Sequence, residues 1–283
     1  MTAPIEQRIV LSHHLSLTAQ MWGEADAPPL LALHGWLDNA GSYAYLAPIL
    51  AQHWHVIALE LPGHGHSGHL PAGTNYHYLD YVSAVLAAID ALPWERYTLL
   101  GHSLGAGIAS LVAAAAPQRI DRLCLIEGLG PLGDDGSHTL QRFRDAFAAP
   151  ATQGKSLRMF RDIDQAISAR TLASGLRADL ARPIVERGLL ETEDGWRWRS
   201  DSRLTRPSAM RLAESQIRAL LAGMETPTAL LLANPATPYL PTPLMQARAS
   251  YVRHIAVDHM DGGHHLHLEH PQAVAAWLHN ACQ

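Results

Sequence analysis

Short apolar runs bounded by glycine or proline alternate along most of this chain with longer segments in which apolar residues recur at three- and four-residue spacing. The short runs predict buried strands and the longer segments predict helices. Such an alternation is typical of a parallel sheet covered by helices on both faces. We therefore expect one large α/β domain, and 283 residues, 48% of them hydrophobic, are enough to bury its core.

Eight strands are expected, at residues 9–11, 16–23, 30–34, 56–59, 97–100, 123–126, 228–233 and 254–257. The first two flank a polar turn at residues 12–14, which predicts an antiparallel hairpin at one edge of a mostly parallel sheet. Helices are expected at residues 42–52, 78–92, 104–115, 242–249 and 272–279.

The alternation breaks between residues 130 and 224, where polar helical segments, several arginines and a Trp-rich piece at 195–198 occur. We interpret this block as a helical cap inserted into a core formed by residues 1–129 and 225–283. The cap arginines either face solvent or meet an acidic substrate, and the solvated face is the more common case. They are Arg197, Arg199, Arg203 and Arg206.

The formal net charge of −5 gives no global field that would recruit nucleic acid or an anionic membrane. No apolar stretch approaches the roughly 20 residues needed to cross a bilayer. Cys124 and Cys282 form no disulfide framework, and the first 14 residues contain Glu6 and no signal-peptide core. We expect a soluble cytoplasmic protein that acts on a small molecule, without nucleic acid and without membrane insertion; a homodimer is left open.

Residues 101–105 read GHSLG, which fits the pattern G-x-S-x-G, and they lie between an expected strand and an expected helix. A serine on such a sharp turn has its oxygen exposed, and the flanking glycines let neighbouring backbone pass. The helix N-terminus behind it favours developing negative charge. This context predicts Ser103 as a nucleophile rather than part of an ordinary Gly-Ser turn.

Residues 33–36, LHGW, close another expected strand. An oxyanion hole needs two backbone N–H groups, and in this architecture one comes from the residue after the nucleophile and one from such a loop. We therefore expect Leu104 and Trp36 to supply them. The alternative is a plain turn in which His34 only hydrogen-bonds to backbone.

A general base is expected in residues 261–271, DGGHHLHLEHP, which follow the last strand. Imidazole titrates near neutral pH and can take and return the proton of a serine. Metal binding by His264, His265, His267 and His270 is the competing interpretation, but no cysteines or carboxylates are grouped here to complete such a site. We expect neither a metal nor a cofactor.

At these residues the chain resembles the α/β-hydrolase family, and residues 33–43, LHGWLDNAGSY, resemble its serine hydrolase-like, carboxylesterase-type subgroup. The resemblance covers nearly the whole chain and includes residues 60–67, where Glu60 stands in place of the usual Asp, and the cap residues 186–204. The family pattern of Gly-His followed by E-x-P implies His264 as the base, with Glu269 and Pro271 in register.

The acid of the expected triad departs from the common family pattern. Many members place an Asp after the seventh strand, where this chain has Ala236. Similarity to relatives that use a carboxylate at the end of the sixth strand implies Glu127 instead, although Glu127 could also cap the first cap helix. Weaker candidates are Asp134, Asp135 and Asp258.

A serine at the elbow distinguishes this chain from dehalogenases and epoxide hydrolases of similar fold, which need an Asp there. The expected function is hydrolysis of a small to medium carboxylic ester through an acyl-enzyme on Ser103, with His264 as base and Glu127 orienting it. A thioesterase and a carbon–carbon bond hydrolase could use the same triad. A non-catalytic binding scaffold is the alternative from another class.

Overall fold

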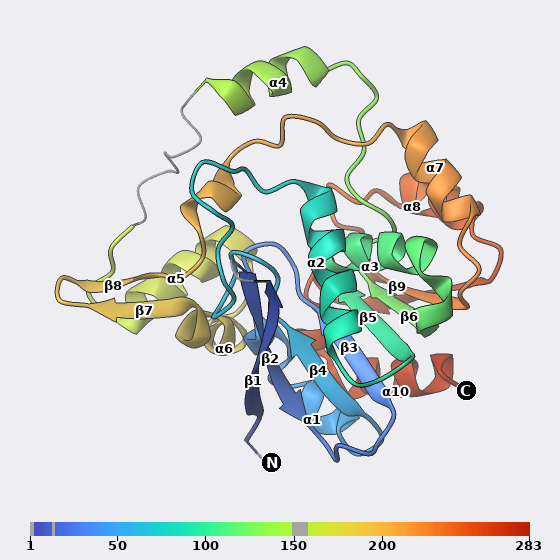
Figure 1. Ribbon diagram of the computed structural model, residues 1–283, viewed down its shortest axis with the longest axis horizontal. Coiled ribbons are helices and arrows are strands. Elements are labelled where there is room, and N and C mark those ends of the chain that lie inside the picture. Colours follow the sequence, from blue (N-terminus) through green and yellow to red (C-terminus); the bar gives the residue numbers. More distant parts are fainter. Residues whose placement is uncertain (1–2, 13–14, 149–157) are drawn as a thin grey trace.

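The computed structural model describes residues 3–12, 15–148 and 158–283. Its centre is an eight-stranded sheet with the order β1-β2-β4-β3-β5-β6-β9-β10 (Figure 1). The strands are β1 (Ile5–Ser12), β2 (Leu15–Trp22), β3 (Pro29–Leu33), β4 (His55–Leu59), β5 (Tyr97–His102), β6 (Ile120–Ile126), β9 (Thr228–Asn234) and β10 (Ile255–Asp261). From β4 to β10 all neighbouring strands are parallel, so the predicted α/β class with a mostly parallel eight-stranded sheet is confirmed.

The opening hairpin is at the sheet edge, where β1 pairs antiparallel with β2, as predicted. His13 and His14 of the expected turn lie outside the described residues. Strand ends differ from the prediction where strands continue through polar residues: β6 begins at Ile120, before Asp121 and Arg122, and β10 ends at Asp261. Backbone pairing continues there although the side chains are partly exposed, so hydrophobicity alone underestimates these strands.

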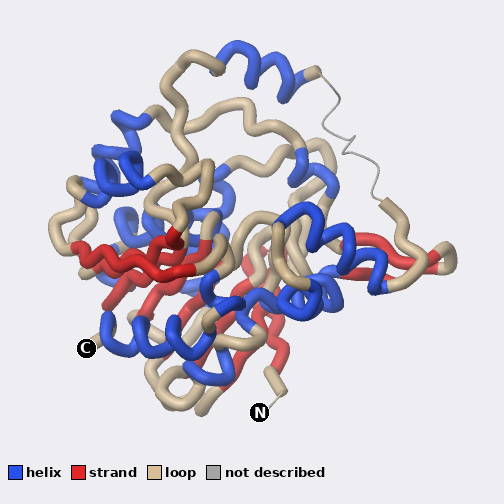
Figure 2. Tube along the Cα trace, turned by 180° about the vertical axis from the view of Figure 1, so that it is seen from behind, coloured by secondary structure: helices blue, strands red, loops and turns tan. Residues whose placement is uncertain are grey.

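Helices cover both faces of the sheet. The helices α2 (Tyr78–Ala91) and α3 (Leu104–Ala115) pack on one face, while α1 (Ala47–Leu50) and α10 (Pro271–Ala281) pack on the other (Figures 1 and 2). Alternate residues of each strand serve the two faces: Leu31 and Leu33 pack with α2 and α3, whereas Leu30 and Ala32 pack with α1 and α10. Strands buried on both faces account for the uninterrupted apolar runs in the sequence.

The single helix expected over residues 42–52 is divided in two. A 3-10 helix, η1 (Ala40–Tyr43), precedes α1, and Pro48 lies in the first turn of α1. Proline has no N–H to donate within a helix, but in the first turn none is needed, so it favours a new start at this point.

The connecting segment, residues 128–227, joins β6 to β9. Its described elements are α4 (Thr139–Phe147), α5 (Ile163–Ser174), α6 (Ala178–Gly188), β7 (Leu189–Thr192), β8 (Gly195–Trp198), η3 (Ser202–Thr205) and α7 (Glu214–Ala222). The prediction of a helical cap did not foresee a strand pair in this segment, and the Trp-rich piece forms the hairpin β7–β8. Trp196 and Trp198 are two residues apart, so both indoles lie on one side of β8 and pack against the same small cluster.

The connecting segment packs in two ways. One part has its own small core, which includes Phe160, Ile167, Ile184, Val185 and Leu189. Another part contributes to the main core, through Leu129, Leu204, Ile217, Leu221 and Met224. The boundaries of a separate cap at residues 130 and 224 therefore stay a prediction.

The remaining described elements are short. They are η2 (Pro117–Arg119), α8 (Thr242–Ala249) and α9 (Leu266–Glu269). No helix in the described part of the chain is long and apolar enough to cross a membrane.

Candidate active site

Ser103 lies on the turn between β5 and α3 and is the N-cap residue of that helix. Its backbone has φ 52° and ψ −114°, a conformation that costs an L-residue roughly 1–3 kcal/mol and is kept only where the surroundings enforce it. The glycines of the motif permit the close packing: a Cβ at Gly105 would collide with the carbonyl oxygen of Leu33, and one at Gly101 with the backbone of Gly105 and Ala106. The turn therefore requires both glycines and holds the Ser103 hydroxyl at the carboxyl edge of the sheet.

His264 follows β10 and lies between Ser103 and Glu127. Its Nε2 is 2.9 Å from the Ser103 Oγ, and its Nδ1 is 2.9 Å from the Glu127 Oε2. A carboxylate only accepts hydrogen bonds, so Nδ1 donates to Glu127 and Nε2 is left to accept the serine proton. The structure thus brings together the three residues predicted for the triad, in the order that general-base chemistry requires.

Glu127 directly follows β6 and is nearly fully buried. Its Oε1 accepts the Ala233 N–H at 2.6 Å, and its Oε2 accepts the hydroxyl of Thr237 as well as His264. Burial by itself raises the pKa of Glu127, but these three hydrogen bonds outweigh it and hold that pKa below its usual value. The carboxylate is therefore ionised at neutral pH, as a partner of imidazolium must be.

Other acids considered for this role are engaged elsewhere. Asp134 pairs with Arg142 and accepts from Thr139, Asp135 accepts from Ser137, and Asp258 accepts the indole N–H of Trp277. Sequence reasoning missed Thr237, which holds Glu127 from the loop after β9. Its position next to Ala236, where an Asp is usual in the family, was the available signal.

The loop after β3 lies beside the nucleophile because Leu33 pairs with Gly101 in the parallel register of β3 and β5. Leu104 is the first residue of α3, so its N–H has no acceptor within the helix. Trp36 is half exposed, and its indole N–H donates to the Leu204 carbonyl at 3.2 Å. The two residues predicted to form an oxyanion hole thus flank the Ser103 turn; their role as donors stays a prediction.

His34, in the same loop, has a structural role. Its Nδ1 donates to the Gly35 carbonyl at 2.7 Å, and its Nε2 accepts the Leu61 N–H at 3.1 Å. Burial lowers the pKa of His34, so it stays neutral and bridges two loops at this edge of the sheet.

Three of the four histidines weighed as metal ligands have separate partners, and within the described part of the chain no partner is assigned to the side chain of His270. His264 faces Ser103, His265 lies 3.3 Å from an Asp38 carboxylate oxygen, and His267 shares a 2.8 Å hydrogen bond with Ser42. Among the described residues, donor atoms of Asp38, His102 and His265 lie within 4.8 Å of one another, close enough to hold a metal ion. The guanidinium of Arg170 already pairs with Asp38 there, so we assign no metal ligand.

Three of the four cap arginines hold loops together. Arg203 donates to Asp201 and to the carbonyl groups of Leu70, Pro71 and Thr74; Arg199 donates to the Leu189 carbonyl, and Arg206 to that of Ala146. Arg197 is exposed. These contacts give Arg199 and Arg206 structural roles within the connecting segment, and Arg203 joins the segment to the loop between β4 and α2.

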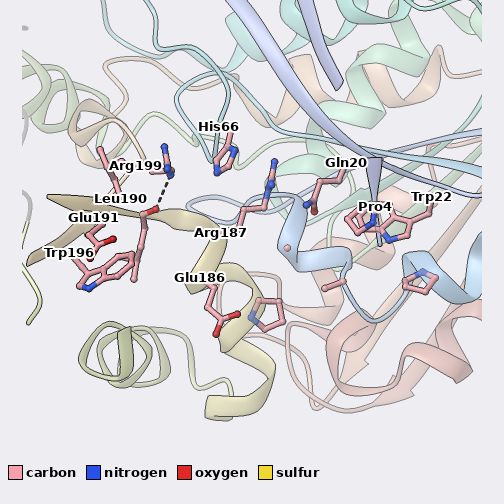
Figure 3. Close-up of a pocket in the computed structure, with 15 residues that line it drawn as sticks. Pro4, Gln20, Trp22, His66, Glu186, Arg187, Leu190, Glu191, Trp196 and Arg199 are labelled. Carbon is pink, nitrogen blue, oxygen red and sulfur yellow. Dashed lines mark hydrogen bonds between the residues drawn. The ribbon is translucent and has the colours of Figure 1, made fainter. Parts of the chain in front are cut away.

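A groove and a smaller cavity lie among the described residues. A groove of about 740 Å³ lies between the sheet edge and the connecting segment, and the residues that line it include Gln20, Trp22, His66, Arg187 and Trp196 (Figure 3). No residue of the candidate triad lines this groove. A smaller cavity of about 100 Å³ is lined by both predicted oxyanion residues together with aromatic and apolar side chains, among them Tyr76, Tyr78, Leu204 and Ala209. The smaller cavity is the one next to the nucleophile.

Comparison with known proteins gives consistent results. The family model described as alpha/beta hydrolase fold matches residues 28–224. A serine hydrolase-like protein of Dictyostelium discoideum is 29% identical over 95% of this chain and 79% of that protein. The crystal structure of a hypothetical protein from Pseudomonas aeruginosa is 37% identical, covers 98% of each chain and has a TM-score of 0.88. A thioesterase domain from the curacin biosynthetic pathway is 26% identical, covers 98% of this chain and 99% of that one, and has a TM-score of 0.84.

Proposed function

The chain belongs to the alpha/beta hydrolase fold family, and from this premise we propose that it is a serine hydrolase that cleaves a small to medium carboxylic ester through an acyl-enzyme. The observation that carries the proposal is the continuous hydrogen-bond chain from Ser103 through His264 to Glu127. A scaffold without catalysis would need neither the strained Ser103 turn nor the buried carboxylate behind the imidazole.

In the proposed reaction, the Ser103 Oγ bonds to the acyl carbon while its proton passes to the Nε2 of His264. Glu127 stabilises the imidazolium that forms, and the N–H groups of Leu104 and Trp36 hold the negative oxygen. The C–O bond then breaks, and His264 protonates the leaving alcohol. Water attacks the acyl-enzyme by the same steps in reverse, so the chemistry requires no cofactor.

The cavity beside Leu104 and Trp36 supports an acyl group of limited size, because its volume is only about 100 Å³ and its walls combine aromatic side chains with polar ones. A thioesterase is the second candidate, favoured by the similarity to a thioesterase domain along almost the whole chain. Both activities would use the same acyl-enzyme, so only the leaving group distinguishes them. We further propose a small-molecule partner and a cytoplasmic location, in keeping with the two free cysteines.

A fluorophosphonate probe and a substrate panel test the proposal. The probe should label the native protein and leave Ser103→Ala unlabelled, because it reacts with an activated serine. Matched oxygen esters and thioesters of graded acyl chain length should then show the highest kcat/KM among short oxygen esters. Labelling of Ser103→Ala, or no turnover of any acyl compound by a labelled native protein, would contradict the proposal; a preference for thioesters would establish the second candidate.

A further inference from the structure

Asp38, in the loop after β3, is a buried charge with several partners. One carboxylate oxygen pairs with the guanidinium of Arg170. The other lies 3.3 Å from the Nε2 of His265 and 3.9 Å from the Nδ1 of His102. Burial raises the pKa of Asp38, but Arg170 and then His265 outweigh it and hold that pKa well below its usual range. Asp38 is therefore ionised inside the protein.

Two of the side chains around Asp38 are next to triad residues in the chain, and of these His265 is within hydrogen-bond distance of the carboxylate. His265 follows His264, and His102 precedes Ser103. In addition, the His102 Nε2 donates to the backbone carbonyl of His264 at 2.9 Å, so the ring fastens the nucleophile turn to the loop that carries the base. The rings of His102 and His264 are 4.8 Å apart, centroid to centroid. The position of the His264 backbone thus depends on the side chains gathered around Asp38.

Arg170 comes from a distant part of the chain, on helix α5 of the connecting segment. Its side chain is only 14% exposed, so without it the Asp38 carboxylate would lose its close positive partner in a buried place. Without Arg170, the hydrogen-bonding side chains nearest to the Asp38 carboxylate are His265 and Ser42, and His265 directly follows His264 in the chain.

A second buried ion pair provides an internal comparison. Arg187, at the end of α6, forms two hydrogen bonds with Glu60, at 2.7 and 2.9 Å. Glu60 also accepts the N–H groups of Ala40 and His66, and none of these contacts involves a triad residue. Both pairs therefore join the connecting segment to the core, but only the Asp38–Arg170 pair reaches the candidate triad.

We propose that Asp38 and Arg170 are positioning residues for the hydrolytic reaction, which align His264 with Ser103 through His265, the next residue in the chain. This inference rests on the proposed function. It links the connecting segment to the catalytic step itself: a substrate or a motion that displaces α5 also disturbs the Ser103–His264 hydrogen bond.

The matched variants Arg170→Met and Arg187→Met test the inference, because each removes one buried guanidinium and keeps the aliphatic stem. Arg170→Met should lower kcat and the rate of fluorophosphonate labelling roughly 10- to 100-fold, since a small misplacement of the base is costly, while KM changes less than about threefold. Arg187→Met should lower the unfolding temperature by a similar amount but keep kcat within about threefold of the native value. Arg170→Lys should restore part of the lost kcat, because it returns the charge without the planar fork.

The outcomes separate the inference from the proposed function. If fluorophosphonate leaves the native protein unlabelled, both fail. If the native protein is labelled but Arg170→Met reacts at the native rate, or loses no more kcat than Arg187→Met, the positioning role alone is overturned. If Arg170→Met does not fold, Arg170→Lys replaces it: a lower kcat with unchanged KM supports the positioning role, and a native kcat overturns it.

Discussion

The candidate triad and the connecting segment are placed by different means. Ser103 and Glu127 directly follow β5 and β6, in left-handed backbone conformations with φ 52° and 54°, and each N–H bonds to a neighbouring strand at 3.0 and 2.9 Å. The connecting segment is instead joined to the core by side chains, notably the buried pairs Arg170–Asp38 and Arg187–Glu60, and it has a small core of its own.

This difference means that most of the connecting segment can vary without a change in the chemistry of the site, the Arg170–Asp38 pair being the exception. Backbone turns at strand ends are fixed by the register of the sheet, so a change in the connecting segment leaves them in place. Helix α4 lies far from the sheet at the top of Figures 1 and 2, and its side chains Phe143 and Phe147 are exposed. It does not contribute to the two hydrophobic clusters that cover the sheet. Changes at the strand ends should therefore affect rate, and changes in the segment should affect stability and selectivity, except at Arg170, which reaches the site through Asp38.

The largest expected effect is that of Ser103→Ala. It should lower kcat for an accepted ester on the order of 10⁴- to 10⁶-fold, since the nucleophile is lost. The unfolding free energy should stay within about 1 kcal/mol of native, because only an oxygen at a turn is removed. Ester kinetics and urea unfolding measure both quantities. A variant as fast as the native protein would show that the strand ends do not carry the chemistry.

Glu127→Gln should lower kcat roughly 10²- to 10⁴-fold, because an amide can hold His264 in the wrong tautomer. Stability should fall little, since the amide oxygen can still accept the Ala233 N–H that Oε1 accepts now.

The controls Asp134→Asn, Asp135→Asn and Asp258→Asn should each keep most of the activity, because these acids bond to other residues than His264. If one of them lost activity while Glu127→Gln kept it, the acid assignment would move to that residue.

Two leucine truncations compare the cores directly. Leu99→Ala, in the central strand β5, should lower the unfolding free energy by about 3–5 kcal/mol, because the side chain is fully buried between strands that cannot move to fill the cavity. Leu189→Ala, in the small core of the connecting segment, should cost about 2–3 kcal/mol and leave kcat close to native. Urea unfolding gives both values. Equal losses would mean that the segment is as tightly packed as the sheet.

The last expected effect, which is small near neutral pH, is a pH dependence of stability that arises in the core around the site. Burial, together with neighbouring histidines, lowers the pKa of His64 and of His267 to about 3, against an unfolded value of 6.5. Below pH 6.5 the unfolded chain therefore binds more protons than the folded one, and stability falls as the pH is lowered from 6.5 toward 3. The slope should be about 1.4 kcal/mol per pH unit for each group.

Urea unfolding at a series of pH values measures the slope of stability against pH. His64→Gln removes one of the two histidines, so it should reduce the slope by roughly 1.4 kcal/mol per pH unit. An unchanged slope in the variant would mean that His64 is not held neutral in the folded protein.

Much of the fold could be predicted from the sequence. All eight strands of the main sheet were expected, because strands buried on both faces are apolar throughout and are bounded by turn residues. The helices α3 and α8 begin and end at the predicted residues. A single helix was predicted over residues 42–52, where the structure has the two shorter helices η1 and α1. The hairpin β7–β8 was missed because four residues are too few to show a strand's alternation.

Some residues of the candidate site could likewise be predicted from the sequence, and others could not. Ser103 and His264 are marked by local motifs, and the family resemblance added Glu127, which the structure places against His264. Their catalytic roles stay predictions. Thr237, Asp38 and Arg170 were not expected, since nothing near them in the chain indicates which partner each one meets.

The sequence by itself determined the class of fold, the strained turn at Ser103 and the loop that carries His264, because glycine spacing and hydrophobic period act over a few neighbouring residues. Only the tertiary structure decided that Thr237 holds Glu127 and that Arg170 reaches Asp38 across 132 positions of the chain. The physical reason is that a buried charge takes whichever partner the packing brings within hydrogen-bond distance. Packing is a property of the whole chain, whereas a turn belongs to a few residues.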